Sequence, residues 1–124
     1  STDMHIITER SAYESYHIFS KVLMKSNIIC PEEFEIYEKI YTNESKLPDT
    51  FIYIMTPPEV CVKRIKKRNR TFEQNISFEY IQELHQRYEK TFRQTFINTF
   101  IIDGTLSQSE IFDQTKAILE KMNN

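Results

Sequence analysis

The segment from Phe51 to Arg70 most constrains how this chain can fold. It opens with five consecutive apolar residues, FIYIM, as does a strand that is buried on both faces of a parallel sheet. The next residues, Thr56-Pro57-Pro58-Glu59, combine a threonine cap, a proline at the first helical position and a glutamate at the third. We therefore predict a buried strand that leads directly into a helix starting at about Pro57.

Similar signals recur along the chain. Short runs of β-branched and apolar residues predict two further strands, at His5–Thr8 and Phe100–Ile102. Apolar residues at helical spacing and capping signals predict four further helices. They lie at about 11–25 and 31–44, from Ser77 with an apolar stripe as far as Phe92, and from Ser107 to the polar tail at Met122. About three strands that alternate with five helices indicate an α/β fold, a parallel sheet flanked by helices in a single domain.

The first of these helices has a specific expected pattern. Ser11 and Glu14 have the spacing of a capping box, so the helix should begin there. Tyr16, Phe19 and Leu23 follow at helical spacing and should form its apolar stripe. Just before the helix, Glu9-Arg10 is either a ligand-binding pair at the carboxyl end of a strand or a surface ion pair at a turn.

The predicted helix after Pro57 carries an unusual density of positive charge. Six of the eight residues from Lys63 to Arg70 are basic: Lys63, Arg64, Lys66, Lys67, Arg68 and Arg70. Like charges this close repel each other, so a binding clamp would need a compensating anion, most commonly a phosphate chain. From the run alone, a solvated charged face is the simpler interpretation. Beyond it, residues 69–75 lack apolar periodicity and predict an irregular, mobile loop.

Composition limits the function further. With 16 basic and 18 acidic side chains the net charge is −2, so local basicity favours a discrete anionic ligand over a nucleic acid. No run approaches the roughly 18 apolar residues of a membrane span, and Cys30 and Cys61 predict buried thiols in a reducing compartment. We therefore expect a soluble, cytoplasmic protein, with a mitochondrial location left open. The single glycine, Gly104, excludes a P-loop from these residues.

The order of these parts resembles the deoxynucleoside kinase family, whose members transfer the γ-phosphate of ATP to the 5′-hydroxyl of a deoxynucleoside. The resemblance rests on Glu9-Arg10-Ser11 followed by Tyr13 and Phe19, on IYIMTPPEVCVKR from Ile52, on RIKKRNRTFE from Arg64 and on YIQELHQRYE from Tyr80. It implies a P-loop-kinase-like fold, of which these residues would be the C-terminal portion. It also implies ATP with magnesium as the cofactor and a role in deoxynucleotide salvage.

The resemblance implies a role for each matching residue near the sugar and base. Glu9 matches a carboxylate that either accepts the proton of the 5′-hydroxyl or binds magnesium, and both roles stay open. Arg10 matches the arginine that holds the 5′-hydroxyl region, and Phe19 a residue that lines the base pocket. Ser15 stands where relatives have an acidic residue or alanine, so base choice stays open, with a lean towards pyrimidines.

The resemblance also implies a lid over residues 64–75. Arg64, Arg68 and Arg70 match the lid arginines, which close over the ATP phosphates and neutralise charge that develops during transfer. Glu73 matches the lid carboxylate that binds the 3′-hydroxyl of the sugar. The last matching segment, Asp103, Gly104 and Thr105, corresponds to the loop beside the adenine of ATP.

Three readings of function stay open. In this family the P-loop, a catalytic carboxylate and a base-reading glutamine precede the E-R-S motif, so we expect these residues alone to be inactive. A thymidylate kinase is an alternative within the same reaction class. A truncated, non-catalytic homologue is the alternative from another class, acting in binding or as a homodimer through helices near 11–25 and 31–44. RNA binding is the least favoured function, because only one short run is basic.

Overall fold

The computed structural model describes residues 6–43 and 47–122. The chain separates into two compact units, Ser1–Pro48 and Asp49–Asn124, which we call unit 1 and unit 2. No helix within the described ranges is long and apolar enough to cross a membrane.

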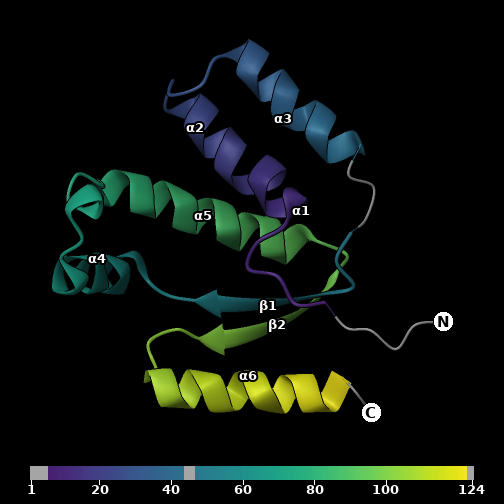
Figure 1. The fold of residues 1–124 in the computed structure, drawn as a ribbon, viewed down its shortest axis with the longest axis vertical. Coiled ribbons are helices and arrows are strands. Elements are labelled where there is room, and N and C mark those ends of the chain that lie inside the picture. The colour runs from purple at the N-terminus through teal and green to yellow at the C-terminus, as the bar shows by residue number, and fades with distance from the viewer. Residues whose placement is uncertain (1–5, 44–46, 123–124) are drawn as a thin grey trace. The chain divides into compact units, whose positions relative to one another are not determined.

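Unit 2 is built around two parallel strands, β1 (Thr50–Met55) and β2 (Asn98–Asp103). Between them the chain forms α4 (Pro58–Arg68), a short 3₁₀ turn (Thr71–Glu73) and α5 (Phe78–Gln94), and α6 (Gln108–Met122) follows β2. The strands pair in register from Thr50 opposite Asn98 to Met55 opposite Asp103. The predicted α/β class with a parallel sheet is therefore confirmed (Figure 1).

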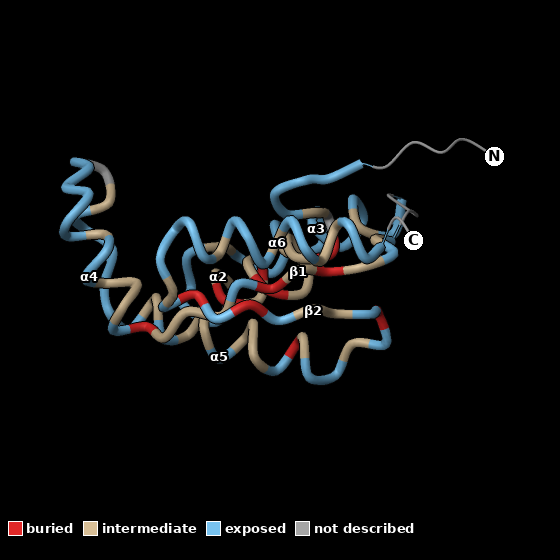
Figure 2. Tube along the Cα trace, turned by 90° about the horizontal axis from the view of Figure 1, so that it is seen from below, coloured by how far each residue is buried: buried red, intermediate tan, exposed pale blue. Residues whose placement is uncertain are grey.

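Helices lie on opposite faces of this sheet, α5 on one and α6 on the other (Figure 1). Against α5, the rings of Phe51 and Tyr53 pack on Phe92, with centroids 4.8 and 4.9 Å away. On the other face Ile102 is 1% exposed. Figure 2 shows this buried core along the two strands. The expectation that FIYIM is buried throughout is wrong at Ile54, which is 46% exposed.

The number of strands differs from the prediction. Ile6–Thr8, expected to form a strand, has no regular structure, and Ile6 and Ile7 are 73% and 72% exposed. A strand needs a neighbour to pair its backbone groups, and within the described residues β1 and β2 pair only with each other. His5, the first residue of the expected strand, lies outside those residues. The count of five helical segments is confirmed in the described part of the chain.

Unit 1 is helical, and its first helix is not a plain α-helix. It runs through α1 (Ala12–Glu14), a π-helix (Ser15–Ser20) and α2 (Lys21–Lys25), and α3 (Pro31–Asn43) follows. A π-helix bonds each N–H to the carbonyl five residues back, and this shifts the buried stripe. Ile18 and Val22 are 0% and 3% exposed, whereas the predicted stripe residues Tyr16, Phe19 and Leu23 are only partly buried.

Aromatic rings hold the two helical segments of unit 1 together. Tyr16 stacks on Tyr41 of α3 at 4.8 Å and contacts Phe34 at 5.7 Å. The Tyr16 hydroxyl also donates a hydrogen bond to Glu38 at 3.1 Å. Ile36 and Ile40 of α3 are 57% and 52% exposed, so α3 also presents an apolar face that no described residue covers.

Two of the predicted helix caps form and two do not. Ser77 accepts a hydrogen bond from the N–H of Tyr80 at 3.1 Å, and Ser107 pairs with Glu110 through both backbone and side chain. The hydroxyl of Ser11 is instead buried without a hydrogen-bond partner, and the residue before it, Arg10, has a left-handed backbone. The cap of α4 is Pro57 rather than Thr56, so that helix starts one residue later than expected.

The prediction of two buried thiols also fails at one position. Cys61 lies half-buried in α4, but Cys30 is exposed. Cys30 directly precedes α3, where its thiol donates to Glu33 at 3.3 Å. The Cys30 thiol therefore makes a polar contact at the exposed start of α3, where we had expected it to pack in the core.

Tyr53 links β1 to α5 by a hydrogen bond, and this predicts a pH-dependent stability. Its hydroxyl donates to Glu89 at 3.0 Å, and burial, followed by this hydrogen bond, raises the pKa of Tyr53. Unfolded tyrosine ionises near its ordinary pKa of about 10. The contribution of Tyr53 to stability is therefore fully present below about pH 10 and is lost as pH rises towards the higher folded-state pKa.

Tyr53→Phe is expected to lower the free energy of unfolding near neutral pH by about 1 kcal/mol. It should also flatten the fall in stability between about pH 10 and about pH 12. Urea unfolding at several pH values measures both effects, and Tyr80→Phe removes a hydroxyl from the same unit as a control. Equal pH profiles for Tyr53→Phe and the unsubstituted protein would exclude this assignment.

Candidate functional site

The structure brings Arg10 and Phe19 into direct contact in unit 1. The guanidinium carbon of Arg10 lies 4.4 Å from the centroid of the Phe19 ring, a cation–π geometry. Arg10 has a φ of 70°, a conformation that residues other than glycine adopt rarely and that is enriched at functional sites. Glu9 beside it is exposed. Ser15 is half-buried and is the first residue of the π-helix.

The predicted lid begins where α4 ends. Lys66, Lys67 and Arg68 occupy the last turn of α4, where the negative end of the helix dipole favours cations. Asn69 ends the helix with a φ of 52°, and its N–H bonds to the Ile65 carbonyl at 3.1 Å. This left-handed cap is a standard way to stop a helix and turn the chain.

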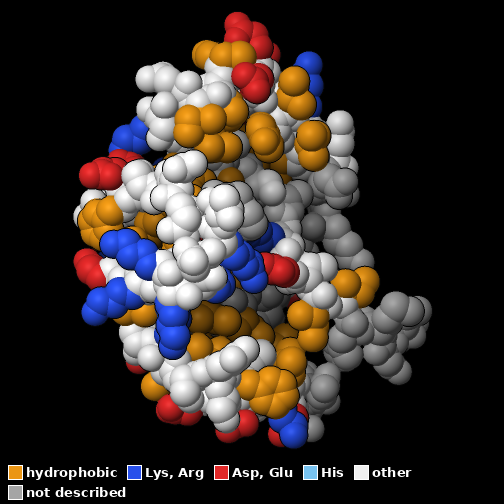
Figure 3. All heavy atoms as spheres, turned by 60° about the vertical axis from the view of Figure 1, so that its left-hand side comes forward, with side chains coloured by type: hydrophobic (Ala, Val, Ile, Leu, Met, Phe, Trp, Pro, Cys, Tyr) orange, Lys and Arg blue, Asp and Glu red, His pale blue; other side chains and the backbone are white. Residues whose placement is uncertain are grey.

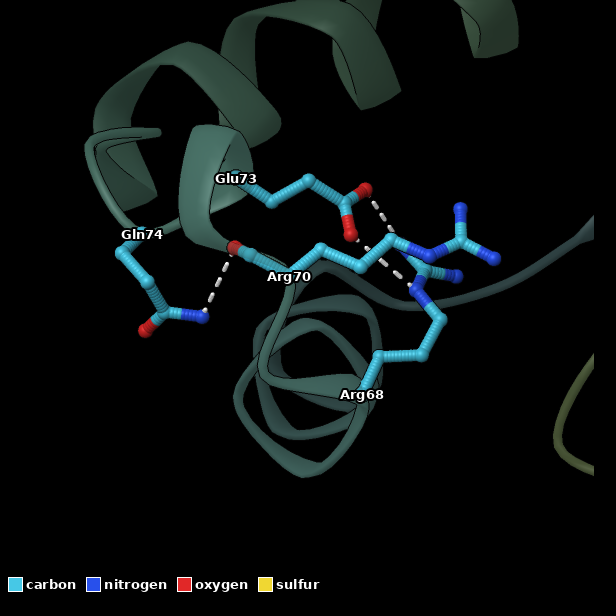
Figure 4. Close-up of polar contacts among 4 residues, drawn as sticks. All are labelled: Arg68, Arg70, Glu73 and Gln74. Atoms are coloured by element: carbon cyan, nitrogen blue, oxygen red, sulfur yellow. Dashed lines mark hydrogen bonds and ion pairs between the residues drawn. The ribbon is translucent and has the colours of Figure 1, made fainter.

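Residues after Asn69, which we expected to form a mobile loop, form a hydrogen-bonded turn. The Arg70 carbonyl accepts bonds from the N–H of Glu73 at 3.0 Å and from the side-chain amide of Gln74 at 3.2 Å. Glu73 is thereby turned back towards the end of α4 (Figure 4). Hydrophobic periodicity does not reveal this turn, because hydrogen bonds between polar groups hold it.

Arg68 and Glu73 form a two-point ion pair within this turn (Figure 4). The Arg68 Nε donates to one carboxylate oxygen at 3.1 Å and Nη2 to the other at 2.5 Å. The Glu73 side chain is only 12% exposed, against 47% for Arg68. Two residues with different expected ligands, phosphate for Arg68 and sugar for Glu73, are therefore paired with each other.

Arg64 and Arg70 extend the positive surface around this pair. Arg64 lies four residues before Arg68 and hence on the same face of α4, and both Arg64 and Arg70 are exposed. Neither forms an ion pair with a described residue. Lys and Arg side chains gather over α4 on the face that Figure 3 shows. This surface offers uncompensated guanidinium groups to an anion.

The carboxyl ends of β1 and β2 meet at Gly104. Its N–H bonds to the Met55 carbonyl at 2.7 Å, and a Cβ at this position would overlap the Thr56 hydroxyl. Next to it, the hydroxyl and N–H of Thr105 donate to Asp103 at 2.6 and 2.9 Å and lower the pKa of the Asp103 carboxyl. These three residues form a compact turn at the sheet edge where α/β folds bind ligands.

The residues fit the two groups that a kinase reaction needs to different degrees. The guanidinium groups of unit 2 match the charge and fork geometry that phosphates require. For magnesium, no cluster of three acidic, histidine or cysteine side chains occurs in the described ranges. Mg²⁺ is commonly held by one or two carboxylates together with phosphates and water, so Glu9 can contribute at most part of such a site.

Sequence reasoning missed three residues that the structure ties to these positions. Thr56, expected only as a cap, packs against Gly104. Gln74 holds the lid turn, and Ser20 bonds within the π-helix. The single glycine, Gly104, could have indicated a close contact at Thr56. Nothing in the sequence pattern marks Gln74 or Ser20. A shallow hollow along α5 touches no predicted site residue and is lined by His85, Gln86, Glu89, Lys90, Arg93 and Gln94.

Comparison with known proteins decides the family. The deoxynucleoside kinase family model matches residues 1–124. The chain belongs to the deoxynucleoside kinase family. It shares 35% identity over 115 residues with a protein of Invertebrate iridescent virus 6 that is named as a kinase, covering 91% of this chain and 59% of that protein. With deoxycytidine kinase 2 of Gallus gallus it shares 35% identity over 102 residues, covering 73% of this chain and 38% of the relative.

A solved structure agrees with the family and the fold. Deoxyadenosine kinase from M. mycoides with bound dATP matches with a TM-score of 0.73 and 28% identity, covering 98% of this chain and 63% of that one. The chain thus spans about three fifths of the length of the viral relative and of the solved structure.

Proposed function

We propose that these residues form the lid and the sugar-binding part of a kinase that transfers the γ-phosphate of ATP to the 5′-hydroxyl of a deoxynucleoside. The observation that carries the proposal is the turn after α4, where Arg68 and Glu73 are held together beside Arg64 and Arg70. Phosphoryl transfer asks a protein mainly for positioning and for positive charge at the phosphate oxygens. This turn supplies both.

The proposed roles divide between substrate and donor. Arg10 holds the 5′-hydroxyl region, and Glu9 either accepts the proton of that hydroxyl or contributes to magnesium binding. Phe19 and Ser15 lie beside the base. Magnesium, when bound with ATP, would neutralise charge on the phosphates.

On the donor side, Arg64, Arg68 and Arg70 bind the ATP phosphates as the lid closes, and Asp103, Gly104 and Thr105 border the adenine. Because the Glu73 carboxylate already accepts from Arg68, a sugar hydroxyl that donates to Glu73 competes with Arg68 for that carboxylate. Substrate binding would then release Arg68 towards phosphate, which couples lid closure to the presence of the substrate.

Transfer also needs a phosphate cradle, which these 124 residues cannot form because they contain one glycine. The test compares the chain alone with a completed kinase, meaning these residues joined to a segment that supplies G-x-x-x-x-G-K-[ST]. We expect ATP-dependent phosphorylation of thymidine or deoxycytidine only by the completed kinase, with kcat about 10²-fold lower in Arg10→Ala.

Three other results would revise the proposal. Turnover by the chain alone would contradict the need for a cradle. Phosphorylation of dTMP but not of thymidine would select a thymidylate kinase. A completed protein that dimerises but neither binds nor phosphorylates nucleosides would favour the non-catalytic homologue.

The exposed face of α3 supports a homodimer as part of this proposal. Ile36 and Ile40 lie four residues apart, hence on one face of the helix, and both are more than half exposed. Ile40→Glu is expected to raise the dimer dissociation constant on the order of 100-fold, because it places a charge in an apolar interface. Sedimentation measures this constant, and Glu35→Gln on the same helix is the control. A monomeric unsubstituted protein would refute the dimer.

A further inference from the structure

Ser20 stands out as a fully buried polar residue inside the π-helix. It is 0% exposed, and its hydroxyl donates to the Tyr16 carbonyl at 2.6 Å. In an α-helix that carbonyl would accept the backbone N–H of Ser20 itself, four residues on. In a π-helix each N–H bonds to the carbonyl five residues back. The Ser20 hydroxyl thus donates to the carbonyl that its own N–H would use in a regular α-helix.

The π-helix determines the direction of Phe19. Inserting one residue into a helical turn rotates the side chains that follow by about 100° around the axis. Phe19 lies within the π-helix, and its ring meets the Arg10 guanidinium. Relative to a regular α-helix from Ser11 onwards, the wider π turn therefore changes the direction in which Phe19 points.

Two unfavourable conformations flank this single contact. Arg10 has a left-handed backbone, which costs about 1–3 kcal/mol, and π-helical turns are rare and concentrate at functional sites. The left-handed residue and the π-helix each involve only a few neighbouring residues, and both help to place the side chains of Arg10 and Phe19. Their coincidence indicates that the placement of Phe19 against Arg10 matters more than the local stability of the helix.

We infer that Ser20 is a positioning residue: its hydroxyl maintains the π-helix, and the π-helix holds Phe19 against Arg10 on the face that meets the deoxynucleoside. The last clause rests on the proposed function. The link from Ser20 to the Arg10–Phe19 contact does not, because all of these residues lie in unit 1.

Proton NMR of the Arg10 side chain tests the link. Protons above an aromatic ring resonate upfield. The Phe19→Leu variant therefore gives the chemical shift of the Arg10 side-chain protons without the ring. In Ser20→Ala most of the upfield shift should be lost. Ser20→Thr restores a hydroxyl that can bond to the carbonyl four residues back, and should restore the shift. Val22 is also buried and lies two residues further on, in α2, so Val22→Ala should lower stability and leave the shift in place.

The comparison of Ser20→Ala with Val22→Ala decides the inference even if threonine is too large for the site. An unchanged Arg10 shift in Ser20→Ala, or an equal loss in Val22→Ala, would overturn it. In the completed kinase, Ser20→Ala should raise KM for the deoxynucleoside several-fold while KM for ATP stays unchanged. If the completed protein binds no deoxynucleoside, the proposed function fails, and the NMR comparison still decides the role of Ser20.

Discussion

Replacing Gly104 by alanine is expected to lower the free energy of unfolding of unit 2 by about 3 kcal/mol, as overpacking of a tight site does. The added Cβ would overlap the Thr56 hydroxyl and lie 2.8 Å from the Met55 carbonyl oxygen. Both belong to backbone or short side chains that cannot swing away. The φ of Gly104 is not positive, so alanine brings no backbone strain and would otherwise stabilise by about 0.4–1 kcal/mol.

Urea unfolding followed by circular dichroism measures this change. Combining Gly104→Ala with Thr56→Ala removes the hydroxyl that the Cβ meets, so the double variant should recover part of the loss relative to Thr56→Ala alone. If the free energy of unfolding of Gly104→Ala lies within about 0.5 kcal/mol of the unsubstituted value, the turn can rearrange to accommodate the Cβ and the prediction is wrong.

Replacing Arg70 by alanine in the completed kinase is expected to lower kcat by about 10²–10³-fold, the usual effect of removing one donor that stabilises transition-state charge. Arg70 is exposed and forms no ion pair with a described residue. Its guanidinium is therefore available to the phosphates without breaking an existing bond. KM for the deoxynucleoside should change little, since Arg70 is assigned to the phosphates.

Lys67→Ala is the matched control, because Lys67 is exposed in the same basic run and has no assigned role. Steady-state kinetics with ATP and a deoxynucleoside compare the two variants. We expect kcat of Lys67→Ala to stay within about twofold of the unsubstituted value, as for surface charges away from a site. An equal fall in both variants would mean that the run acts only as a general positive surface.

Local signals predicted the elements whose causes are local. FIYIM followed by two prolines and a glutamate predicted β1 and α4, because apolar continuity and proline at a helix start act within a few residues. Ser77 and Ser107 were correctly predicted as caps for the same reason. The assignment of residues 64–75 to a lid, which rests on their match to a family motif, stays a prediction.

Predictions failed where a distant contact or an unusual helix decides the outcome. Ile6–Thr8 has the composition of a strand, but pairing depends on a neighbour, which composition does not reveal. The π-helix changed which residues of 11–25 are buried, and hydrophobic periodicity assumes regular helical turns. The burial of Ser20 could not be predicted from the sequence, because a serine at that spacing is equally compatible with the surface of a helix.

By itself, the sequence determined the fold class, the order of helices, and the absence of a P-loop from these residues, because all three depend on residue type and spacing. Only the tertiary structure decided that Arg68 is forked on Glu73, that Arg10 lies over Phe19, and that Gly104 touches Thr56. These contacts depend on backbone directions set by a left-handed cap, a π-helix and a strand pairing. Such directions follow from hydrogen bonds and packing in three dimensions, which residue spacing does not encode.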